Sequence, residues 1–184
     1  MDLHKAQILS SEFYDCVFRE CNFVESILNK CRFVNSSFKS CDLSLIQVLE
    51  SSFSVTRFED SKVMGVNWAQ ADWPTSGLGK PLEFLRSVIS HSTFIGLSLK
   101  DLKIKDCVAI DVDFREADLS QADFAGTDLS KSLFKDTNLT EADLSQARNY
   151  DIDPGQNILQ GAKFSLPEAM SLLYSMEIIL IDET

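Results

Sequence analysis

The sequence predicts an all-β fold, a right-handed quadrilateral parallel β-helix with a short C-terminal α-helix. Three observations predict it: an apolar residue recurs at every fifth position, a small residue stands two positions before most of these, and a period of five fits neither a helix nor an ordinary strand. A chain that turns a corner every five residues points one large and one small side chain inward on each side. Four sides give a coil of about twenty residues, and parallel backbone hydrogen bonds join the coils at roughly 4.8 Å. The right hand is expected because strand twist favours it in parallel crossings.

The large inward positions, which we call centres, form two unbroken series. One begins at Phe13, and the other, displaced by one residue, begins at Phe94. Eleven of the 13 phenylalanines belong to these series, so the aromatic content is concentrated in the predicted core. The first series is Phe13, Phe18, Phe23, Leu28, Phe33, Phe38, Leu43, Val48, Phe53, Phe58, Val63, Trp68 and Trp73, and the second is Phe94, Leu99, Ile104, Ala109, Phe114, Leu119, Phe124, Leu129, Phe134, Leu139 and Leu144.

Centres that are one coil apart should stack on one another along the axis of the solenoid. Burying each phenylalanine contributes about 2–3 kcal/mol, which helps to offset the chain entropy of a fold without a conventional globular core. The predicted ladders are Phe13/Phe33/Phe53/Trp73, Phe18/Phe38/Phe58 and Phe94/Phe114/Phe134.

Each repeat has two further regular positions. The residue two before a centre is usually Ser, Thr, Cys or Ala, and the residue just before a centre is often Asp or Asn. The stretch Ala117-Asp118-Leu119-Ser120-Gln121-Ala122-Asp123-Phe124 shows both. On these residues the chain resembles the pentapeptide repeat family, whose pattern is small–Asp/Asn–Leu/Phe–x–x. The resemblance covers about residues 10–73 and 92–148, and it implies the four-sided solenoid.

We expect one continuous domain with four parts. They are a first solenoid block over residues 1–73, an interrupting loop or irregular segment over 74–91, a second solenoid block over 92–150, and a C-terminal cap of helix and strand over 151–184.

Glycines and prolines break the pattern inside the interrupting segment, at Pro74, Gly77, Gly79 and Pro81. We expect the repeat to resume near Phe84 or Ile89. The segment is either a tolerated surface insertion or a loop that contacts a partner, since loops on rigid scaffolds often carry function. In the second case, Gly77 and Lys80 are candidate contact residues.

The C-terminal segment predicts a cap on the open end of the solenoid. Ser165 and Glu168 match a capping box and predict a helix over about 166–176, followed by a strand-like run over 178–181. The segment holds more apolar residues than one face of a short helix needs, so it either caps the end alone or also pairs with a second copy. The candidate dimerisation residues are Leu166, Met170, Leu173, Met176 and Ile178.

A second resemblance supports the dimer. Residues 159–164 (LQGAKF), then Ala169, Leu173 and Ile178, are similar to the C-terminus of the quinolone-resistance pentapeptide proteins. In those proteins this segment joins two solenoids end to end, which implies a homodimer through the C-terminus here.

Nothing in the sequence predicts catalysis, a cofactor or a metal site. The two histidines, His4 and His91, lie far apart and in no metal or triad pattern, and no glycine-rich phosphate loop is present. All five cysteines occupy the small inward position, so we expect structural thiols. Cys21 and Cys41 should stack, but their Cβ atoms would be farther apart than the roughly 3.8 Å that a disulfide needs.

The acidic balance indicates a basic partner. The net charge is −11, with 28 acidic and 17 basic residues, which disfavours nucleic acid and anionic lipid. Asp118 and Glu141 should share one side of the rod, and Asp123 and Asp143 the next, where stacking of like charges costs stability. These four are candidate partner-binding residues, and a solvated surface that only maintains solubility is the alternative.

The resemblance to the quinolone-resistance proteins implies a partner. Those proteins bind type II topoisomerases and are thought to resemble duplex DNA, so the basic groove of DNA gyrase or topoisomerase IV is the expected target. Duplex DNA carries about one charge per 1.7 Å, far more than this chain, so mimicry is partial. The alternative is an interaction scaffold of an unrelated pathway with an unknown partner. With no apolar run of about 18 residues and no signal-peptide pattern, we expect a cytoplasmic protein.

Overall fold

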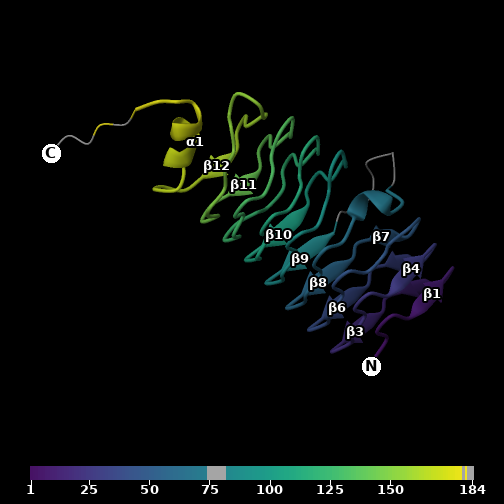
Figure 1. The fold of residues 1–184 in the computed structure, drawn as a ribbon. Coiled ribbons are helices and arrows are strands. Elements are labelled where there is room, and N and C mark those ends of the chain that lie inside the picture. The colour runs from purple at the N-terminus through teal and green to yellow at the C-terminus, as the bar shows by residue number, and fades with distance from the viewer. Residues whose placement is uncertain (74–81, 180, 182–184) are drawn as a thin grey trace.

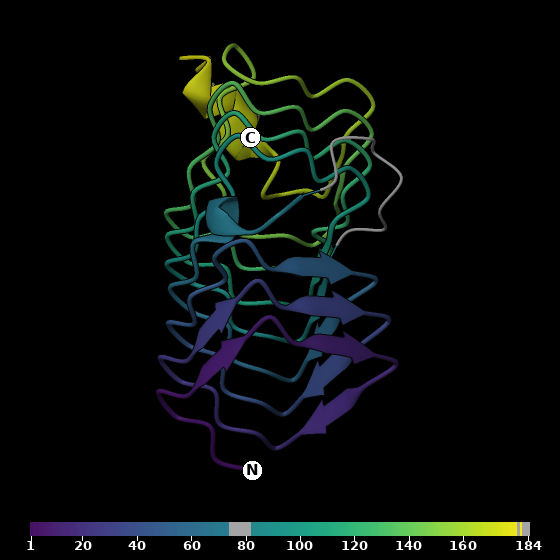
Figure 2. The ribbon, with the colours of Figure 1, turned by 90° about the vertical axis from the view of Figure 1, so that its right-hand side faces the viewer.

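The computed structural model describes residues 1–73, 82–179 and 181, and the predicted parallel β-solenoid is confirmed. About eight turns are stacked along one axis, with the N-terminus and the short helix α1 (Met170–Ser175) at opposite ends (Figures 1 and 2). No helix in the described part of the chain has the length and apolar character needed to span a membrane.

The strands are three residues long or shorter, and each pairs in parallel with the coil above or below. The largest sheet follows one side of the rod in the order β10-β9-β8-β6-β3. The strands are β1 (Gln7–Leu9), β2 (Glu12–Tyr14), β3 (Val17–Arg19), β4 (Ile27–Asn29), β5 (Arg32–Val34), β6 (Ser37–Lys39), β7 (Ser52–Ser54), β8 (Arg57–Glu59), β9 (Glu83–Leu85), β10 (Lys103–Lys105), β11 (Asp143–Leu144) and β12 (Lys163–Phe164), with a 3-10 turn η1 (Trp68–Gln70).

The rod has four faces, which we name after the centres Phe13, Phe18, Phe23 and Leu28. The register of the backbone pairs assigns the centres to the faces. The Phe13 face has centres Phe13, Phe33, Phe53, Leu99, Leu119 and Leu139; the Phe18 face has Phe18, Phe38, Phe58, Phe84, Ile104, Phe124 and Leu144; the Phe23 face has Phe23, Leu43, Val63, Ile89, Ala109 and Leu129; and the Leu28 face has Leu28, Val48, Trp68, Phe94, Phe114 and Phe134.

The aromatic ladders fill the axis as predicted, with one exception. Ring centroids in the Phe18/Phe38/Phe58 ladder are 4.7 and 5.0 Å apart, and Phe84 continues it at 5.0 Å. Phe13, Phe33 and Phe53 stack at 4.8 and 5.1 Å, and Phe94, Phe114 and Phe134 at 5.4 and 5.2 Å.

Trp73 was expected above Phe53, and this expectation is wrong. Its indole Nε1–H donates to the backbone carbonyl of Trp68 at 2.8 Å, which holds its ring against the ring of Trp68, 6.4 Å away. Phe53 instead meets Trp68 edge-on at 5.3 Å. Trp68 in turn stacks on Phe94 at 6.0 Å, so the ladder of the Leu28 face crosses the interruption.

The small inward position carries a second, polar ladder. The hydroxyl of Ser51 accepts a hydrogen bond from the amide of Cys31 at 2.9 Å and donates to the carbonyl of Leu28 at 2.8 Å. Cys31 repeats the donor role with its thiol, toward the carbonyl of Ile8 at 3.2 Å. Small polar residues therefore satisfy buried backbone groups that face the interior of the corner.

The interruption is shorter than the predicted segment 74–91. Steps between coils are normally 20 residues, but the step across the interruption is 26, as the pairing of Phe58 with Phe84 shows. Resumption at Phe84 is confirmed: Leu82 and Ile89 are fully buried, and Glu83–Leu85 form β9. The prediction was too long because the first residues after the interruption depart from the consensus, with Leu82 at the small position and Glu83 and Val88 in place of Asp or Asn. Gly77 and Lys80 lie outside the described residues.

The corners use a backbone conformation that the repeat pattern did not predict. The second residue after nearly every centre has a positive φ, for example 52° at Asp15 and 58° at Glu141, although most of these residues are not glycine. This conformation costs about 1–2 kcal/mol for a residue with a Cβ. Packing of the centres and the hydrogen bond of the corner amide to the next coil, 3.0 Å from Asp15 to Val34, offset the cost.

The C-terminal cap differs from the prediction in its helix. The helix α1 has six residues, not the expected 166–176, and no side chain caps its N-terminus. Ser165 and Glu168 do not form the predicted capping box, because they cap the solenoid: Ser165 Oγ accepts from the amide of Gln146 at 3.1 Å, and Glu168 Oε1 accepts from the amide of Asn149. Residues 178, 179 and 181 of the predicted strand-like run are not in a strand.

Candidate partner-binding surfaces

The aspartates just before the centres have a structural role. The Oδ1 atoms of Asp118, Asp123 and Asp143 accept hydrogen bonds from the amide two residues later, at 3.1, 3.0 and 2.9 Å. This is the Asx turn, in which a short side chain replaces a backbone acceptor. Three of the four predicted partner-binding acids therefore form the turns of the solenoid, which explains why Asp and Asn recur at this position.

The four predicted acids lie on two neighbouring faces, as expected. Asp118 and Glu141 lie on the Phe13 face, whereas Asp123 and Asp143 lie on the Phe18 face. Asp123 and Asp143 are paired neighbours in the ladder. The structure places a lysine near each of them, Lys105 at 3.7 Å from Asp123 and Lys163 at 3.7 Å from Asp143.

The surroundings of Asp143 counter the repulsion expected between these like charges. The hydrogen bonds from Ser145, together with the nearby Lys163 and Lys105, lower the pKa of Asp143. A dominant repulsion from Asp123 would have raised the pKa instead. The lysines of the coils above and below therefore neutralise this part of the Phe18 face.

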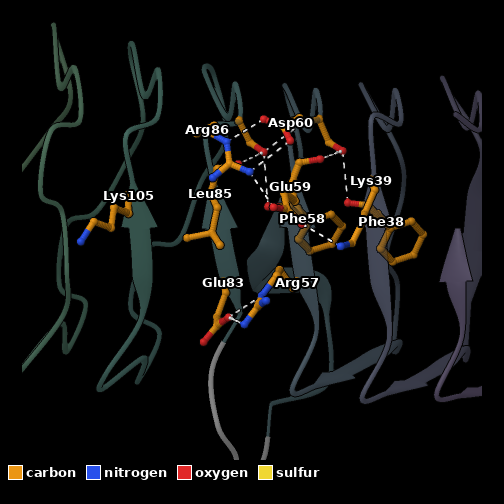
Figure 3. Close-up of polar contacts among 12 residues, drawn as sticks. Phe38, Lys39, Arg57, Phe58, Glu59, Asp60, Glu83, Leu85, Arg86 and Lys105 are labelled. Atoms are coloured by element: carbon orange, nitrogen blue, oxygen red, sulfur yellow. Dashed lines mark hydrogen bonds and ion pairs between the residues drawn. The ribbon is translucent and has the colours of Figure 1, made fainter. Parts of the chain in front are cut away.

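The whole Phe18 face is a neutral mixture of opposite charges. Arg57 contacts Glu83 at 2.7 Å (Figure 3). Lys103 contacts the same carboxylate at 2.9 Å. The outward side chains of the face comprise seven acidic residues (Glu20, Glu59, Asp60, Glu83, Asp106, Asp123, Asp143) and seven basic residues (Arg19, Lys39, Arg57, Arg86, Lys103, Lys105, Lys163).

The densest part of this face lies directly after the interruption. Arg86 contacts Asp60 at 2.8 Å and Glu59 at 2.5 Å, while Lys39 reaches Glu59 from the other side at 3.1 Å (Figure 3). Hydrogen bonds from Lys39 and Arg86 lower the pKa of Glu59, and that from Arg86 lowers the pKa of Asp60. Desolvation raises the pKa of Glu83, but its hydrogen bonds from Lys103 and Arg57 outweigh this effect and lower it.

The Phe13 face is the most acidic of the four. Among the described residues it carries six acidic side chains (Glu12, Asp15, Asp72, Asp101, Asp118, Glu141) and two basic ones (Arg32, Lys100). The other two faces are intermediate, with five acidic and four basic residues on the Phe23 face (Asp2, Glu25, Asp42, Asp111, Asp128; Lys5, Lys62, Lys131, Arg148) and five acidic and three basic residues on the Leu28 face (Glu50, Asp113, Glu116, Asp136, Asp153; Lys30, Arg115, Lys135).

The sequence analysis missed the corner acid Asp15, and it assigned Asp101 to the side of Asp118 and Glu141 without making it a candidate contact residue. Asp15 and Asp101 both have positive φ and exposed side chains, as does Glu141, and they project from the edge of the Phe13 face. The signal was the last position of each repeat, which becomes an outward corner once the coil is built. These corner acids form no turn of their own, although Asp15 accepts a hydrogen bond from Asn35 at 2.5 Å and Glu141 accepts one from Gln121 at 2.7 Å. Their exposed carboxylates can be reached by a partner from solvent.

A surface hollow of about 350 Å³ lies at the edge between the Phe13 and Phe18 faces. Its charged groups, Lys39, Arg57 and Glu83, are all held in the ion pairs described above. Asn35, Ser36, Ser37 and Val55 complete its lining. The hollow therefore offers polar contacts on its floor without a free charged group.

The thiols and histidines show no arrangement for catalysis. Burial raises the pKa of the Cys107 thiol to about 12, so this sulfur is protonated at neutral pH and is a poor nucleophile. His91 is exposed and contacts Asp111 at 3.0 Å. Within residues 1–73, 82–179 and 181, no group of His, Cys, Asp and Glu could hold a metal ion.

The C-terminal cap presents apolar side chains to solvent. Of the predicted dimerisation residues, Leu166 is 81% exposed, Met176 53%, Ile178 41% and Leu173 38%. Met170 is partly buried, unlike the other four. Leu172 packs against the core, which places the exposed residues on the outer side of the cap.

Comparison with known proteins agrees with this geometry. Residues 11–87 match the family model described as a pentapeptide repeat region, and residues 110–148 match the model described as pentapeptide repeats (8 copies). A search of curated proteins finds no match.

Solved structures resemble the chain over nearly its whole length. A trypsin-treated variant of QnrB1, a plasmid-mediated fluoroquinolone resistance protein, superposes with a TM-score of 0.69 at 19% identity, covering 96% of this chain and 99% of QnrB1. Full-length QnrB1 gives a TM-score of 0.67 at 18% identity, covering 94% and 97%. At this identity the likeness establishes the fold alone. Together with the two family models, it shows that the chain belongs to the pentapeptide repeat family.

Proposed function

We propose that this chain is a non-enzymatic, acidic, rod-shaped binding protein that engages a type II topoisomerase, with DNA gyrase as the leading candidate, and modulates or protects it. The observation that carries the proposal is the shared architecture with QnrB1, a fluoroquinolone resistance protein, over nearly the full length of both chains. The similarity of residues 159–164, Ala169, Leu173 and Ile178 to the quinolone-resistance proteins supports the same target.

The distribution of charge supports a one-sided mode of binding. A basic groove is attracted by the Phe13 face, where acids outnumber bases by six to two, and gains nothing from the neutral Phe18 face. Complementary charge of this kind mainly accelerates association and selects the partner. Because only one face is strongly acidic, the rod is a partial DNA mimic and relies on electrostatic steering.

The test compares two variants with the same change in charge. Asp15→Asn/Asp101→Asn/Glu141→Gln removes three corner acids of the Phe13 face, and Glu50→Gln/Glu116→Gln/Asp136→Asn removes three corner acids of the Leu28 face. We expect the first variant to lower the association rate with purified gyrase by about tenfold at low salt, and the second to change it far less.

Gyrase assays decide the target itself. We expect the wild-type protein to alter supercoiling by gyrase, or to reduce poisoning of the enzyme by a quinolone. Absence of binding together with absence of both effects would contradict the proposal. Binding that is equally weakened by both variants would retain gyrase as partner but remove the Phe13 face as the contact.

We also propose that two copies associate through the C-terminal cap. Exposed Leu166, Leu173, Met176 and Ile178 would be covered by the same surface of a second copy, as closed twofold symmetry requires. Light scattering after size exclusion should give twice the chain mass for the wild type and a monomer for Met176→Glu. The control Leu49→Glu changes a residue that is similarly exposed, at 43%, on the side of the rod and should remain dimeric. A monomeric wild type would refute the dimer.

A further inference from the structure

At the interruption, the period of five does not determine the register in which the second block of coils pairs with the first. In a regular corner only two residues separate a centre from the next small position, so each coil is forced to lie above the last. Between Trp73 and Leu82 this constraint is lifted, because the step from coil to coil rises from 20 to 26 residues. The second block could then re-enter displaced by one whole repeat and still point its apolar residues inward.

The apolar pattern penalises such a slip only weakly. If the chain re-entered one repeat later, Ile89 would lie over Phe58 in place of Phe84, and both are apolar centres. The slip would cost two aromatic stacks, Phe58–Phe84 at 5.0 Å and Trp68–Phe94 at 6.0 Å, but it would preserve the alternation of inward and outward positions. Register that is weakly set by hydrophobic pattern needs another determinant.

The outward side chains supply that determinant. On the Phe18 face, Nε and a terminal nitrogen of Arg57 both lie 2.7 Å from Glu83, and Arg86 binds Asp60 through two nitrogens at 2.8 and 3.1 Å (Figure 3). In the slipped register Val88 would face Arg57 and His91 would face Asp60, so both contacts would be lost.

These two contacts differ from the ion pairs of the regular steps. Between coils that are 20 residues apart, each pair is formed through a single nitrogen, as in Lys5–Glu25 at 3.5 Å and Lys30–Glu50 at 3.4 Å, and even Arg148 reaches Asp128 through one nitrogen at 3.5 Å. Two-nitrogen arginine contacts between coils occur, within the described residues, at the 26-residue step. A planar guanidinium fixes geometry in a way that an ammonium group does not.

We propose that the arginine contacts Arg57–Glu83 and Arg86–Asp60 act as a register clamp, which selects the alignment of the second block of coils on the first. The clamp is a positioning device of the scaffold, and it does not depend on the proposed partner. Lys39, Glu59 and Lys103 extend it to the coils on either side.

The test combines two changes: one removes the arginine contacts, and the other removes the extra residues of the interruption that leave the register undetermined. Arg57→Gln/Arg86→Gln deletes both contacts. A second background deletes residues 74–75 and 78–81, which restores a step of 20 and leaves Ser76 and Gly77 as the two residues before Leu82. Glycine suits this corner because the equivalent position has a positive φ in other coils. Hydrogen exchange at the amides of Glu83–Leu85 is measured in all four combinations.

With the interruption present, we expect loss of the clamp to accelerate exchange at β9 by about tenfold or more. In the shortened background the same substitutions should change exchange by less than about twofold. The matched control Lys5→Gln/Lys30→Gln removes two ion pairs from regular steps and should leave β9 unchanged in both backgrounds. An equal acceleration in both backgrounds would show that the arginines form ordinary surface ion pairs, and the proposal would be wrong.

A second variant covers the case in which the shortened chain does not fold. Inserting Gly-Ser-Gly-Ser after Gly77 lengthens the connection, so that the connection constrains the register of the second block less. We expect the clamp substitutions to accelerate exchange at β9 more in this variant than in the wild-type length. An unchanged or smaller effect would overturn the proposal.

Discussion

The two solenoid blocks have the same fold but build their sides differently. Residues 1–73 contain the strands β1 to β8 on three faces, and their interior holds continuous phenylalanine ladders. From residue 106 to 142 the sides are turns linked by single bridges, and Ala, Leu and Phe alternate in the interior.

The residue before each centre contributes to the difference. None of the strands β1 to β10 has Asp or Asn at that position, whereas Asp113, Asp118, Asp123 and Asp128 occupy it in the second block. Each of these carboxylates accepts an amide two residues later, which bends the side into a turn. Asp or Asn at this position favours a turn but does not decide it alone, because Val108 and Leu133 occupy it in turns and Asp143 begins the strand β11. Ring stacking is therefore more extensive in the first block, and side-chain hydrogen bonds to the backbone of the turns are more frequent in the second.

The largest effect is expected from the phenylalanine ladder of the first block. Phe38 is fully buried between the rings of Phe18 and Phe58, so Phe38→Ala should cost about 3–5 kcal/mol in urea unfolding. Phe124 is equally buried but meets Phe114 edge-on and has no ring above or below it on its own face. Phe124→Ala should therefore cost about 1 kcal/mol less. Equal costs would show that stacking adds nothing to burial.

The polar ladder of the small position should give the next largest effect. The Cys107 thiol donates to the carbonyl of Phe84 at 3.4 Å and accepts from the amide of Ser87 at 3.4 Å. Cys107→Ala leaves both groups buried without a partner and should cost about 1–3 kcal/mol. Cys107→Ser retains both bonds and should unfold at nearly the wild-type urea concentration. If alanine is tolerated as well as serine, the position requires only small size.

The turn aspartates should have a smaller effect, confined to the second block. Asp118→Ala removes the acceptor of the Ser120 amide and of the Asn138 side chain, at a cost of about 1 kcal/mol. Asp118→Asn keeps the turn and should be nearly neutral, because Asn138 forms the same turn in the next coil. In the first block, Glu12→Ala changes the equivalent position of a strand and should stay within about 0.5 kcal/mol of the wild type. Thermal unfolding of the three variants measures the comparison.

The sequence predicted the features that depend on which residues point inward, and it did not predict those that depend on closing the coil or on individual side-chain contacts. Periodicity of the centres predicted the coil, the ladders and the burial of the cysteines, because these depend on which residues point inward. The positive φ of corners such as Asp15 follows from closing the coil and has no sequence signature, since almost any residue occupies that position. Trp73 was misplaced because its hydrogen bond to Trp68 is a contact within one coil, which a pattern of stacked coils does not contain. The neutrality of the Phe18 face was missed because it requires pairing each acid with a base from another coil.

The smallest effect is expected when the pH is lowered. It should distinguish the ion pairs at the boundary between the two blocks from the charged groups elsewhere on the rod. Lys39 and Arg86 lower the pKa of Glu59, and Arg86 lowers that of Asp60, so both carboxylates favour the folded state when ionised. Their contribution is present above their unfolded pKa of about 4 and is lost as the pH falls through the lower folded values. The melting temperature should therefore decline between about pH 5 and pH 3, and Glu59→Gln/Asp60→Asn should flatten this decline. Asp15→Asn/Glu20→Gln removes the same charge near the N-terminal end and serves as the control. If the control flattens the curve as much, the pH dependence reflects total charge and the ion pairs beside the interruption have no special part in it.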